Sequence, residues 1–292
     1  MSDGFNRIIQ QLGYEKQFTA PNCARVTVPG LTYTSFDGHA SPQPWSVVSI
    51  IHSSQIDTTN APEDGESILG LHHLFGKNTI FVVVTKVLFY DRLYDEGVAK
   101  APLCMDTSVS NVGRSTVVID TVMTSGQIPL AKYQSSSIIM DRTHGNPVEI
   151  PQQWKSTYGH LCQTGEPMRF RALERPTDQS CVSKVSAGRV SYSDTDANRH
   201  LNFSNYLRFC YDGFISGYLR NDRTRFPRQS VQLKSAFAWY RKQCYYGDDL
   251  ELEFWEHQTK PGTFCVDMLR NGESVYQCLH EFYNIKSIRS SL

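Results

Sequence analysis

The residues Asp194-Thr195-Asp196-Ala197-Asn198-Arg199-His200-Leu201-Asn202 form the most informative stretch of this sequence. In an extended backbone successive side chains point to opposite faces, so the two aspartates, two asparagines and the histidine would share one face. Such groups are costly to bury and are the ones that acid–base chemistry uses. The residues from Phe203 to Cys210 then have the composition of a helix start. A polar cluster that leads into a helix N-terminus can activate water and stabilise an oxyanion.

The second half of the chain predicts one helix and an antiparallel sheet. A short strand at Gly188–Tyr192 precedes a helix at Asn205–Arg220. Four strands follow at Ser230–Tyr240, Leu250–His257, Thr263–Arg270 and Val275–Ile285, with a hairpin turn at Asn271-Gly272. Gly213 and Gly217 weaken a helix unless another element approaches closely, so we expect this helix to lie tightly across the sheet.

The first half of the chain repeats this plan. The segment from Leu31 to His39 is similar to the segment from Val190 to His200, keeps one acid and one histidine, and is two residues shorter. Four further pairs lie 146 to 150 residues apart: Tyr90 with Tyr240, Gly97 with Gly247, Gly113 with Gly262, and Gly126 with Gly272. Four matches in the same order indicate an internal repeat of one structural unit.

The composition also predicts where one unit ends and the next begins. Residues 141–186 contain four prolines and few apolar side chains, which is typical of a linker with one short element near Trp154 and Tyr158. A tether that wraps around the molecule would explain its length. We therefore expect an N-terminal unit over 1–140 and a C-terminal unit over 187–292, in an α+β fold with one long helix packed on each sheet.

The overall composition excludes several classes of protein. Lysine plus arginine equals aspartate plus glutamate at 29 each, so no basic surface indicates nucleic-acid binding. No apolar run approaches the roughly 20 residues of a membrane helix. The N-terminus lacks a secretory signal, and the eight scattered cysteines contain no CxxC pair, which indicates reduced thiols. We expect a cytoplasmic protein, with an organelle neither supported nor excluded.

Three segments carry a resemblance to a known family. Tyr192–Tyr206 resembles the strand-into-helix signature of the hotdog-fold thioesterases of the 4-hydroxybenzoyl-CoA-thioesterase-like family, and Tyr246–Leu252 resembles a turn of that family. The Asp-x-Asn-x-His order and the tandem plan are similar to the plant and bacterial acyl-carrier-protein thioesterases. Tyr240–Cys244 also resembles their Tyr-Arg-Arg-Glu-Cys segment. The resemblance is good over 186–286 and faint over 20–140.

This resemblance implies a tandem, or double, hotdog in which each unit wraps a curved antiparallel sheet around a long helix. It implies an acyl-thioester hydrolase that cleaves fatty acyl-CoA or acyl-carrier-protein to a carboxylic acid and a thiol, with no metal or redox cofactor. Two units in one chain would form an intrachain pseudo-dimer with sites at the seam, and a further homodimer stays open. The sequence does not distinguish the acyl chain length or the thiol carrier.

The resemblance also assigns candidate site residues. Asp196, Asn198 and His200 match the triad of the acyl-carrier-protein thioesterases, where Asn198 and His200 would hold the water and the thioester while Asp196 polarises or orients them. In the smaller single-unit thioesterases the working acid resembles Asp194 by position, so both carboxylates stay candidates. The candidate substrate-binding residues are Asn202, Asn205, Tyr206, Gln243 and Cys244. Capping of the helix is the alternative role for Asn202, Ser204 and Asn205.

Two features depart from the family pattern. Gln243 stands where the family has an acid, and an amide cannot act as a base. The first half has Asp37 and His39 but lacks the intervening asparagine, and prolines flank its helix start. We read it as a degenerate unit that supplies a wall of the acyl pocket.

Three other interpretations compete with hydrolysis. A hotdog dehydratase or hydratase would also use an acid or histidine at the helix entry, and a non-catalytic acyl-binding or scaffolding protein would keep the fold alone. Asp194-x-Asp196-x-Asn198 also resembles the start of a calcium loop, but the sixth position is Arg199 rather than glycine and the twelfth is Asn205 rather than glutamate. We therefore reject a metal site.

Overall fold

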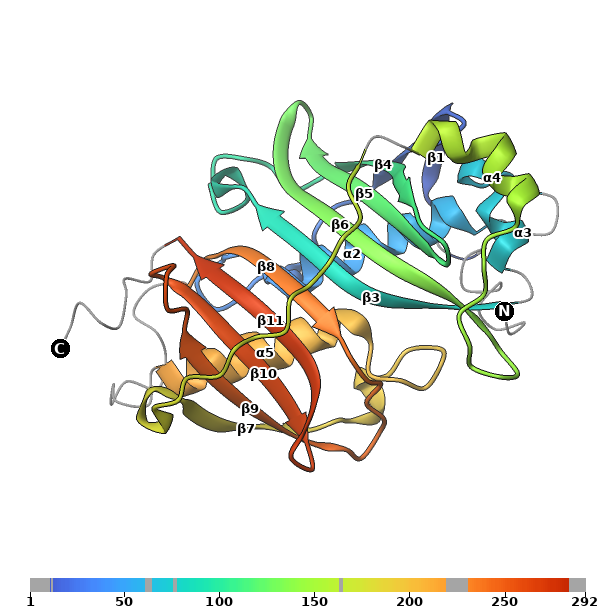
Figure 1. Cartoon of the computed structure of the whole chain (residues 1–292). Coiled ribbons are helices and arrows are strands. Elements are labelled where there is room, and N and C mark those ends of the chain that lie inside the picture. Colours follow the sequence, from blue (N-terminus) through green and yellow to red (C-terminus); the bar gives the residue numbers. More distant parts are fainter. Residues whose placement is uncertain are drawn as a thin grey trace. The chain divides into compact units, whose positions relative to one another are not determined.

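The computed structural model describes residues 11, 13–60, 65–75, 78–162, 165–218 and 231–283 of this protein. Its internal contacts divide the chain into two compact units (Figure 1). Unit 1 contains residues 1–31 and 48–169, and unit 2 contains residues 32–47 and 170–292. The chain therefore contributes a short early segment, Thr32–Val47, to unit 2 before it completes unit 1.

The described residues of unit 1 form an antiparallel sheet with the spatial order β1-β2-β4-β5-β6-β3. Its strands are β1 (Glu15–Ala20), β2 (Cys23–Val28), β3 (Asn78–Phe89), β4 (Leu103–Val112), β5 (Thr116–Ser125) and β6 (Ile128–Asp141). Helix α2 (Pro44–Thr59) packs on this sheet, since the Gln55 amide donates to Thr121 Oγ1 on β5 and the Ser135 hydroxyl on β6 donates to Gln55 Oε1. Two shorter helices, α3 (Leu71–Phe75) and α4 (Gln152–Tyr158), complete the unit.

The described residues of unit 2 form an antiparallel sheet with the order β8-β11-β10-β9-β7. Its strands are β7 (Ser183–Arg189), β8 (Leu233–Tyr240), β9 (Asp249–Glu256), β10 (Thr263–Arg270) and β11 (Glu273–Phe282). Helix α5 (Phe203–Tyr218) crosses one face of this sheet (Figure 1). Short 3₁₀ helices η1 (Tyr33–Ser35), η6 (Tyr192–Asp194) and η5 (Gln179–Cys181) lie in the connections, as η2 (Ile68–Gly70), η3 (Asp91–Leu93) and η4 (Gly159–Cys162) do in unit 1.

The two units repeat one topology. The order β2-β4-β5-β6-β3 in unit 1 corresponds to β7-β9-β10-β11-β8 in unit 2, and a 16-residue helix follows the first strand of each set. The four strands predicted after the helix of the second half are present, with described ends within two residues of the predicted ones. The strand predicted at Gly188–Tyr192 is instead β7 at Ser183–Arg189, and Tyr192 lies in η6. The predicted ends at Arg220, Ser230 and Ile285 lie outside the described residues. The Asn271-Gly272 turn has φ angles of 51° and 76°, as the predicted hairpin requires.

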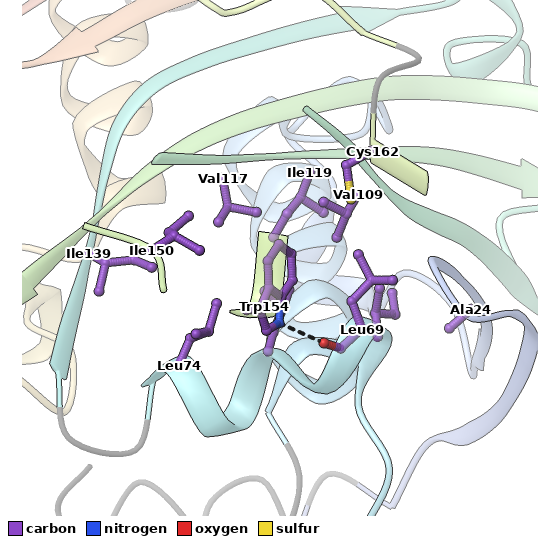
Figure 2. Close-up of a cluster of buried hydrophobic side chains, with 12 residues drawn as sticks. Ala24, Leu69, Leu74, Val109, Val117, Ile119, Ile139, Ile150, Trp154 and Cys162 are labelled. Carbon is purple, nitrogen blue, oxygen red and sulfur yellow. Dashed lines mark hydrogen bonds between the residues drawn. The ribbon is translucent and has the colours of Figure 1, made fainter. Parts of the chain in front are cut away.

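The segment predicted as a linker is partly built into the units. Its predicted short element is α4, and the indole of Trp154 donates a hydrogen bond to the Leu69 carbonyl at 3.0 Å within a buried hydrophobic cluster of unit 1 (Figure 2). Ile150 and Cys162 enter the same cluster. At the other end, β7 begins at Ser183, five residues before the predicted strand. The proline content of this segment does not predict that it packs into the units, because the packing depends on a few single buried side chains.

Helix α5 lies tightly against the sheet, as its glycines predicted. A Cβ atom on Gly217 would lie 2.6 Å from Phe254 Cζ and 3.0 Å from Val185 Cγ1, and one on Gly213 would lie 2.3 Å from Leu252 Cδ1. These close neighbours are side chains of β7 and β9 rather than backbone atoms. The glycines therefore let α5 approach the aromatic and aliphatic side chains of the sheet.

We expect Gly217→Ala to destabilise the protein by about 1 kcal/mol. Overpacking against Phe254 costs about 1–3 kcal/mol, and the better helix propensity of alanine recovers about 1 kcal/mol. Urea unfolding would measure the loss, with Ser216→Ala, an exposed position on the same helix, as the control. A Gly217→Ala protein more stable than the wild type would contradict the close packing.

A buried histidine faces the interior of unit 2. His280 on β11 is 0 % exposed, and neither ring nitrogen has a hydrogen-bond partner among the described residues. Burial lowers its pKa to about 3. Below the unfolded pKa of about 6.5, the unfolded chain binds a proton that the folded protein does not, so stability falls as the pH falls.

We expect His280 to remove about 1.4 kcal/mol of stability between about pH 7.5 and about pH 5.5. In His280→Leu this part of the pH dependence disappears, whereas replacement of the exposed His160 by leucine retains it. Denaturant unfolding of the three proteins at both pH values is the measurement. Equal pH dependence in His280→Leu and the wild type would show that the imidazole is not buried in its neutral form.

Candidate active site

The stretch from Asp194 to Asn202 is not extended, which corrects the first expectation drawn from the sequence. Its first residue ends η6, an isolated bridge joins Thr195 to Leu201, and Arg199 has a φ of 64° in a tight turn between them. Alternate side chains therefore do not share a face. The turn forms because the short Asp196 side chain accepts hydrogen bonds from nearby backbone N–H groups. The alternation of side chains along an extended strand does not predict such a turn.

The carboxylate of Asp196 closes this turn. Its Oδ1 accepts the backbone N–H of Asn198 at 2.8 Å and that of His200 at 3.3 Å. Its own N–H donates to the His200 carbonyl at 2.8 Å, and the Arg199 N–H donates to the Asp196 carbonyl at 2.9 Å. The turn thus gathers Asp196, Asn198 and His200 within five residues, with the Asn198 side chain exposed at its tip.

Asp194 is buried beneath the turn and has both carboxylate oxygens occupied. Its Oδ1 accepts a hydrogen bond from the Arg208 guanidinium, and its Oδ2 accepts the Ser191 N–H at 2.8 Å. Its carbonyl accepts the side-chain amide of Asn205 at 3.0 Å and the Asn202 N–H at 2.9 Å. Asp194 therefore joins η6 to the first two turns of α5.

His200 lies beside the turn that follows β8. An isolated antiparallel bridge pairs His200 with Tyr245, and their rings meet edge to face at a centroid distance of 5.2 Å. The Tyr245 hydroxyl donates to Gln243 Oε1 at 2.9 Å, and Arg270 donates to the Gln243 carbonyl at 2.8 Å. Gln243 therefore supports the aromatic neighbour of His200. Sequence reasoning missed Tyr245, although it lies next to the segment that carries the resemblance.

Two asparagines hold the start of α5. Of the residues predicted as possible caps, Asn202 takes this role, since its Oδ1 accepts the Ser204 N–H at 3.0 Å and the Ser204 hydroxyl at 2.9 Å. Asn205 instead uses its side-chain amide to bind the Asp194 carbonyl. Both side chains have structural partners, so the structure gives each a role in attaching the turn to the helix. The N-terminal end of α5 then presents the positive end of the helix dipole beside the turn.

Tyr206 and Cys244 lie in the interior of unit 2. The Tyr206 hydroxyl accepts the Cys244 N–H at 3.0 Å and donates to the Lys242 carbonyl at 3.3 Å. Tyr206 packs against the rings of Tyr240 and Tyr276. Cys244 is 0 % exposed, and burial raises the pKa of its thiol. The two residues therefore couple α5 to the chain after β8, and neither reaches solvent.

We expect the Cys244 thiol to resist alkylation in the folded protein, since a buried, protonated thiol is a poor nucleophile. Cys181 is exposed and serves as the internal control. Iodoacetamide treatment followed by peptide mass spectrometry should label Cys181 first and Cys244 only after unfolding. Equal rates at the two residues would show that Cys244 lines an accessible site.

The segment Thr32–Gln43 forms the same turn and is the first copy; residues 191–202, at a constant separation of 159 residues, are the second copy. The Asp37 N–H donates to the Ser41 carbonyl at 2.9 Å, and Asp37 Oδ1 accepts the His39 N–H at 2.8 Å and the Ser41 N–H at 2.9 Å. These are the bonds that Asp196 makes. The expectation that the first copy is two residues shorter is therefore wrong.

When the two copies are aligned by their hydrogen bonds, the corresponding residues differ from those that the sequence alone suggested. The bridge between Phe36 and Pro42 matches the bridge between Thr195 and Leu201, so no residue is missing. The matched positions are Ser35 with Asp194, Asp37 with Asp196, His39 with Asn198, Ser41 with His200, and Gln43 with Asn202. The histidines of the two halves are thus not equivalent. The first copy keeps the turn-forming aspartate and lacks the amide and imidazole at the other two positions.

The comparisons with known proteins cover the turn and most of the chain. Residues 177–285 match the family model of the acyl-ACP thioesterase C-terminal domain. The solved 12:0-ACP thioesterase from Umbellularia californica is 13% identical with a TM-score of 0.67. Their alignment covers 91% of this chain and 99% of the thioesterase chain. The acyl-ACP thioesterase from Bacteroides thetaiotaomicron VPI-5482 is 16% identical with a TM-score of 0.61, over 89% and 98%. The predicted resemblance is confirmed.

The fold is shared beyond thioesterases. A MaoC-like dehydratase from Phytophthora capsici is 14% identical with a TM-score of 0.51, over 95% of this chain and 98% of its own. At such identities the likeness shows the fold alone. None of the curated protein sequences matches this chain. Among the described helices, none combines the length and apolar character needed to cross a bilayer.

Proposed function

We propose that this protein is an acyl-thioester hydrolase that cleaves fatty acyl-CoA or acyl-carrier-protein to a free carboxylic acid and a thiol. The observation that carries the proposal is the turn closed by Asp196, which gathers Asp196, Asn198 and His200 in one loop directly before α5 in the chain. The family model that matches residues 177–285 includes this turn and supports the same reaction.

In the proposed reaction, Asp196 activates a water molecule while Asn198 and His200 hold the water and the thioester. The water oxygen attacks the carbonyl carbon, and its proton passes to the carboxylate. Negative charge on the carbonyl oxygen is stabilised by the positive end of α5. The intermediate then collapses, the carbon–sulfur bond breaks, and the departing thiolate takes the proton.

Asp196 is the working carboxylate in this proposal, and Asp194 is not. Both oxygens of Asp194 are engaged, one by Arg208 and one by the Ser191 N–H, and the side chain is only 7 % exposed. Asp196 forms the turn through Oδ1 and is half-buried. A carboxylate whose two oxygens already accept hydrogen bonds from the protein has less capacity to bind a water molecule.

The proposal includes a tandem hotdog, with an N-terminal unit over 1–140, a linker over 141–186 and a C-terminal unit over 187–292. The shared strand order of the two units and the coverage of full-length thioesterase structures support it. The first unit would be degenerate, with the candidate chemistry in the second. Eight unpaired cysteines favour a reducing, cytoplasm-like compartment.

Two other functions would be distinguished from hydrolysis by the products of an activity assay. A dehydratase is considered because the MaoC-like structure has the same fold, and it would convert a 3-hydroxyacyl thioester without releasing a thiol. A non-catalytic acyl-binding protein would bind the thioester and leave it intact. Analysis of both products, thiol and enoyl thioester, separates the three functions.

We expect the wild type to release thiol from at least one acyl-CoA or acyl-carrier-protein in a screen across chain lengths. Asp196→Ala, Asn198→Ala and His200→Ala should each lower kcat by about 100-fold or more, since each loses a group that acts on water or on the developing oxyanion.

The matched control is Asp37→Ala. Asp37 makes the same turn bonds as Asp196, but His39 stands at the position of Asn198 and Ser41 at the position of His200. Asp37→Ala and Asp196→Ala should each lose the hydrogen bonds that close their own turn, but only Asp196→Ala should lose turnover. Equal turnover in all variants would remove the turn from the mechanism, and equal losses in Asp37→Ala and Asp196→Ala would make the effect structural.

A further inference from the structure

The two copies of the turn differ at three positions that could link the turn to its helix. In each case a serine in the first copy corresponds to a larger polar residue in the second: Ser35 to Asp194, Ser46 to Asn205, and Ser49 to Arg208. The first copy nevertheless forms the same backbone hydrogen bonds. The backbone shape of the turn therefore does not require the three larger side chains.

In the second copy these three side chains contact one another. Asn205 and Arg208 lie three residues apart on α5, so they share one face of the helix. Arg208 donates to Asp194 Oδ1, and the Asn205 side-chain amide donates to the Asp194 carbonyl at 3.0 Å. Asp194 also accepts the Ser191 N–H. The side chains thus add two links between η6 and α5, one of them a charge-assisted bond to a buried carboxylate.

The backbone alone makes a weaker attachment. In the first copy the Gln43 N–H donates to the Ser35 carbonyl at 2.8 Å, and in the second the Asn202 N–H donates to the Asp194 carbonyl at 2.9 Å. This is the common link between turn and helix start. In the first copy the Gln43 side-chain amide, just before α2, adds one neutral bond to the Phe36 carbonyl at 3.2 Å. Among the described residues, only the copy that carries Asn198 and His200 is tied to its turn by side chains of the helix itself, so this reinforcement coincides with the candidate chemistry rather than with the fold.

We propose that Arg208 and Asn205 are positioning residues, which act through Asp194 to hold Asp196, Asn198 and His200 at a fixed place relative to the N-terminal end of α5. The inference rests on the proposed hydrolysis. That reaction needs the activated water on the turn and the charge-stabilising end of the helix to remain aligned, and a displacement of about 1 Å costs about 100-fold in rate.

The test replaces the three residues by those of the first copy, in the variant Asp194→Ser/Asn205→Ser/Arg208→Ser. Because the first copy folds with serines at these positions, we expect this variant to keep its circular dichroism spectrum. We expect kcat to fall at least tenfold with KM within about twofold, since the substrate still binds but meets a mobile turn. Amide hydrogen exchange at Asn202 should be at least tenfold faster than in the wild type.

Two further variants make the test specific. Arg189→Ser breaks an exposed ion pair of the same chemistry, between Arg189 and Asp249 in unit 2, and should leave both kcat and the exchange at Asn202 unchanged. Arg208→Lys keeps a cation opposite Asp194 and should retain kcat to within about threefold of the wild type. If Arg208→Lys retains the kcat that the triple-serine variant loses, the charge contact with Asp194 is responsible. A general loss of stability would not be restored by another cation at this position.

The two readouts separate this proposal from the proposed function. A wild type that releases no thiol overturns the hydrolase assignment, and the exchange at Asn202 then still measures the positioning. Unchanged exchange in the triple-serine variant overturns the positioning role whatever the turnover. In an active enzyme, unchanged kcat in the triple-serine variant overturns it as well.

Discussion

The contact between the Asp196 carboxylate and the backbone N–H groups of Asn198 and His200 is the constraint on which the candidate site depends. One oxygen closes the turn and thereby sets where an amide and an imidazole emerge next to a helix start. An aspartate suits this role because its short side chain can satisfy nearby backbone donors without an extended conformation. The same acid therefore provides both the shape of the turn and a carboxylate near it.

The copy at Asp37 acts as an internal control for this interpretation. It makes the same turn with nearly the same distances, so the turn alone is a feature of the fold and does not identify an active site. What remains specific to the second copy are Asn198 and His200, together with the Asp194–Arg208 contact beneath them. Residues that differ while the backbone stays the same are the ones for which chemistry, rather than folding, is the better explanation.

Much of the architecture was predictable from local patterns. Alternating apolar residues located β8 to β11, Asn271-Gly272 located a hairpin turn, and Gly213 and Gly217 indicated the close packing of α5. These features depend on neighbouring residues and on general propensities, which a single sequence contains. The prediction that alternate side chains of residues 194–202 share one face was wrong, because hydrogen bonds between a side chain and the local backbone turn this segment back on itself. The alignment of the two histidines failed because residue identity is a poor guide to register.

The sequence by itself determined the α+β class, the repeated plan, and the residue types that the candidate chemistry would use. Only the tertiary structure decided that Asp194 is engaged by Arg208 and that Cys244 is buried. It also decided that Thr32–Val47 belongs to unit 2. These outcomes depend on contacts between residues far apart in the chain, such as Asp194 with Arg208 and Tyr206 with Cys244. No local pattern records such pairs, because packing forms them only when helix and sheet come together.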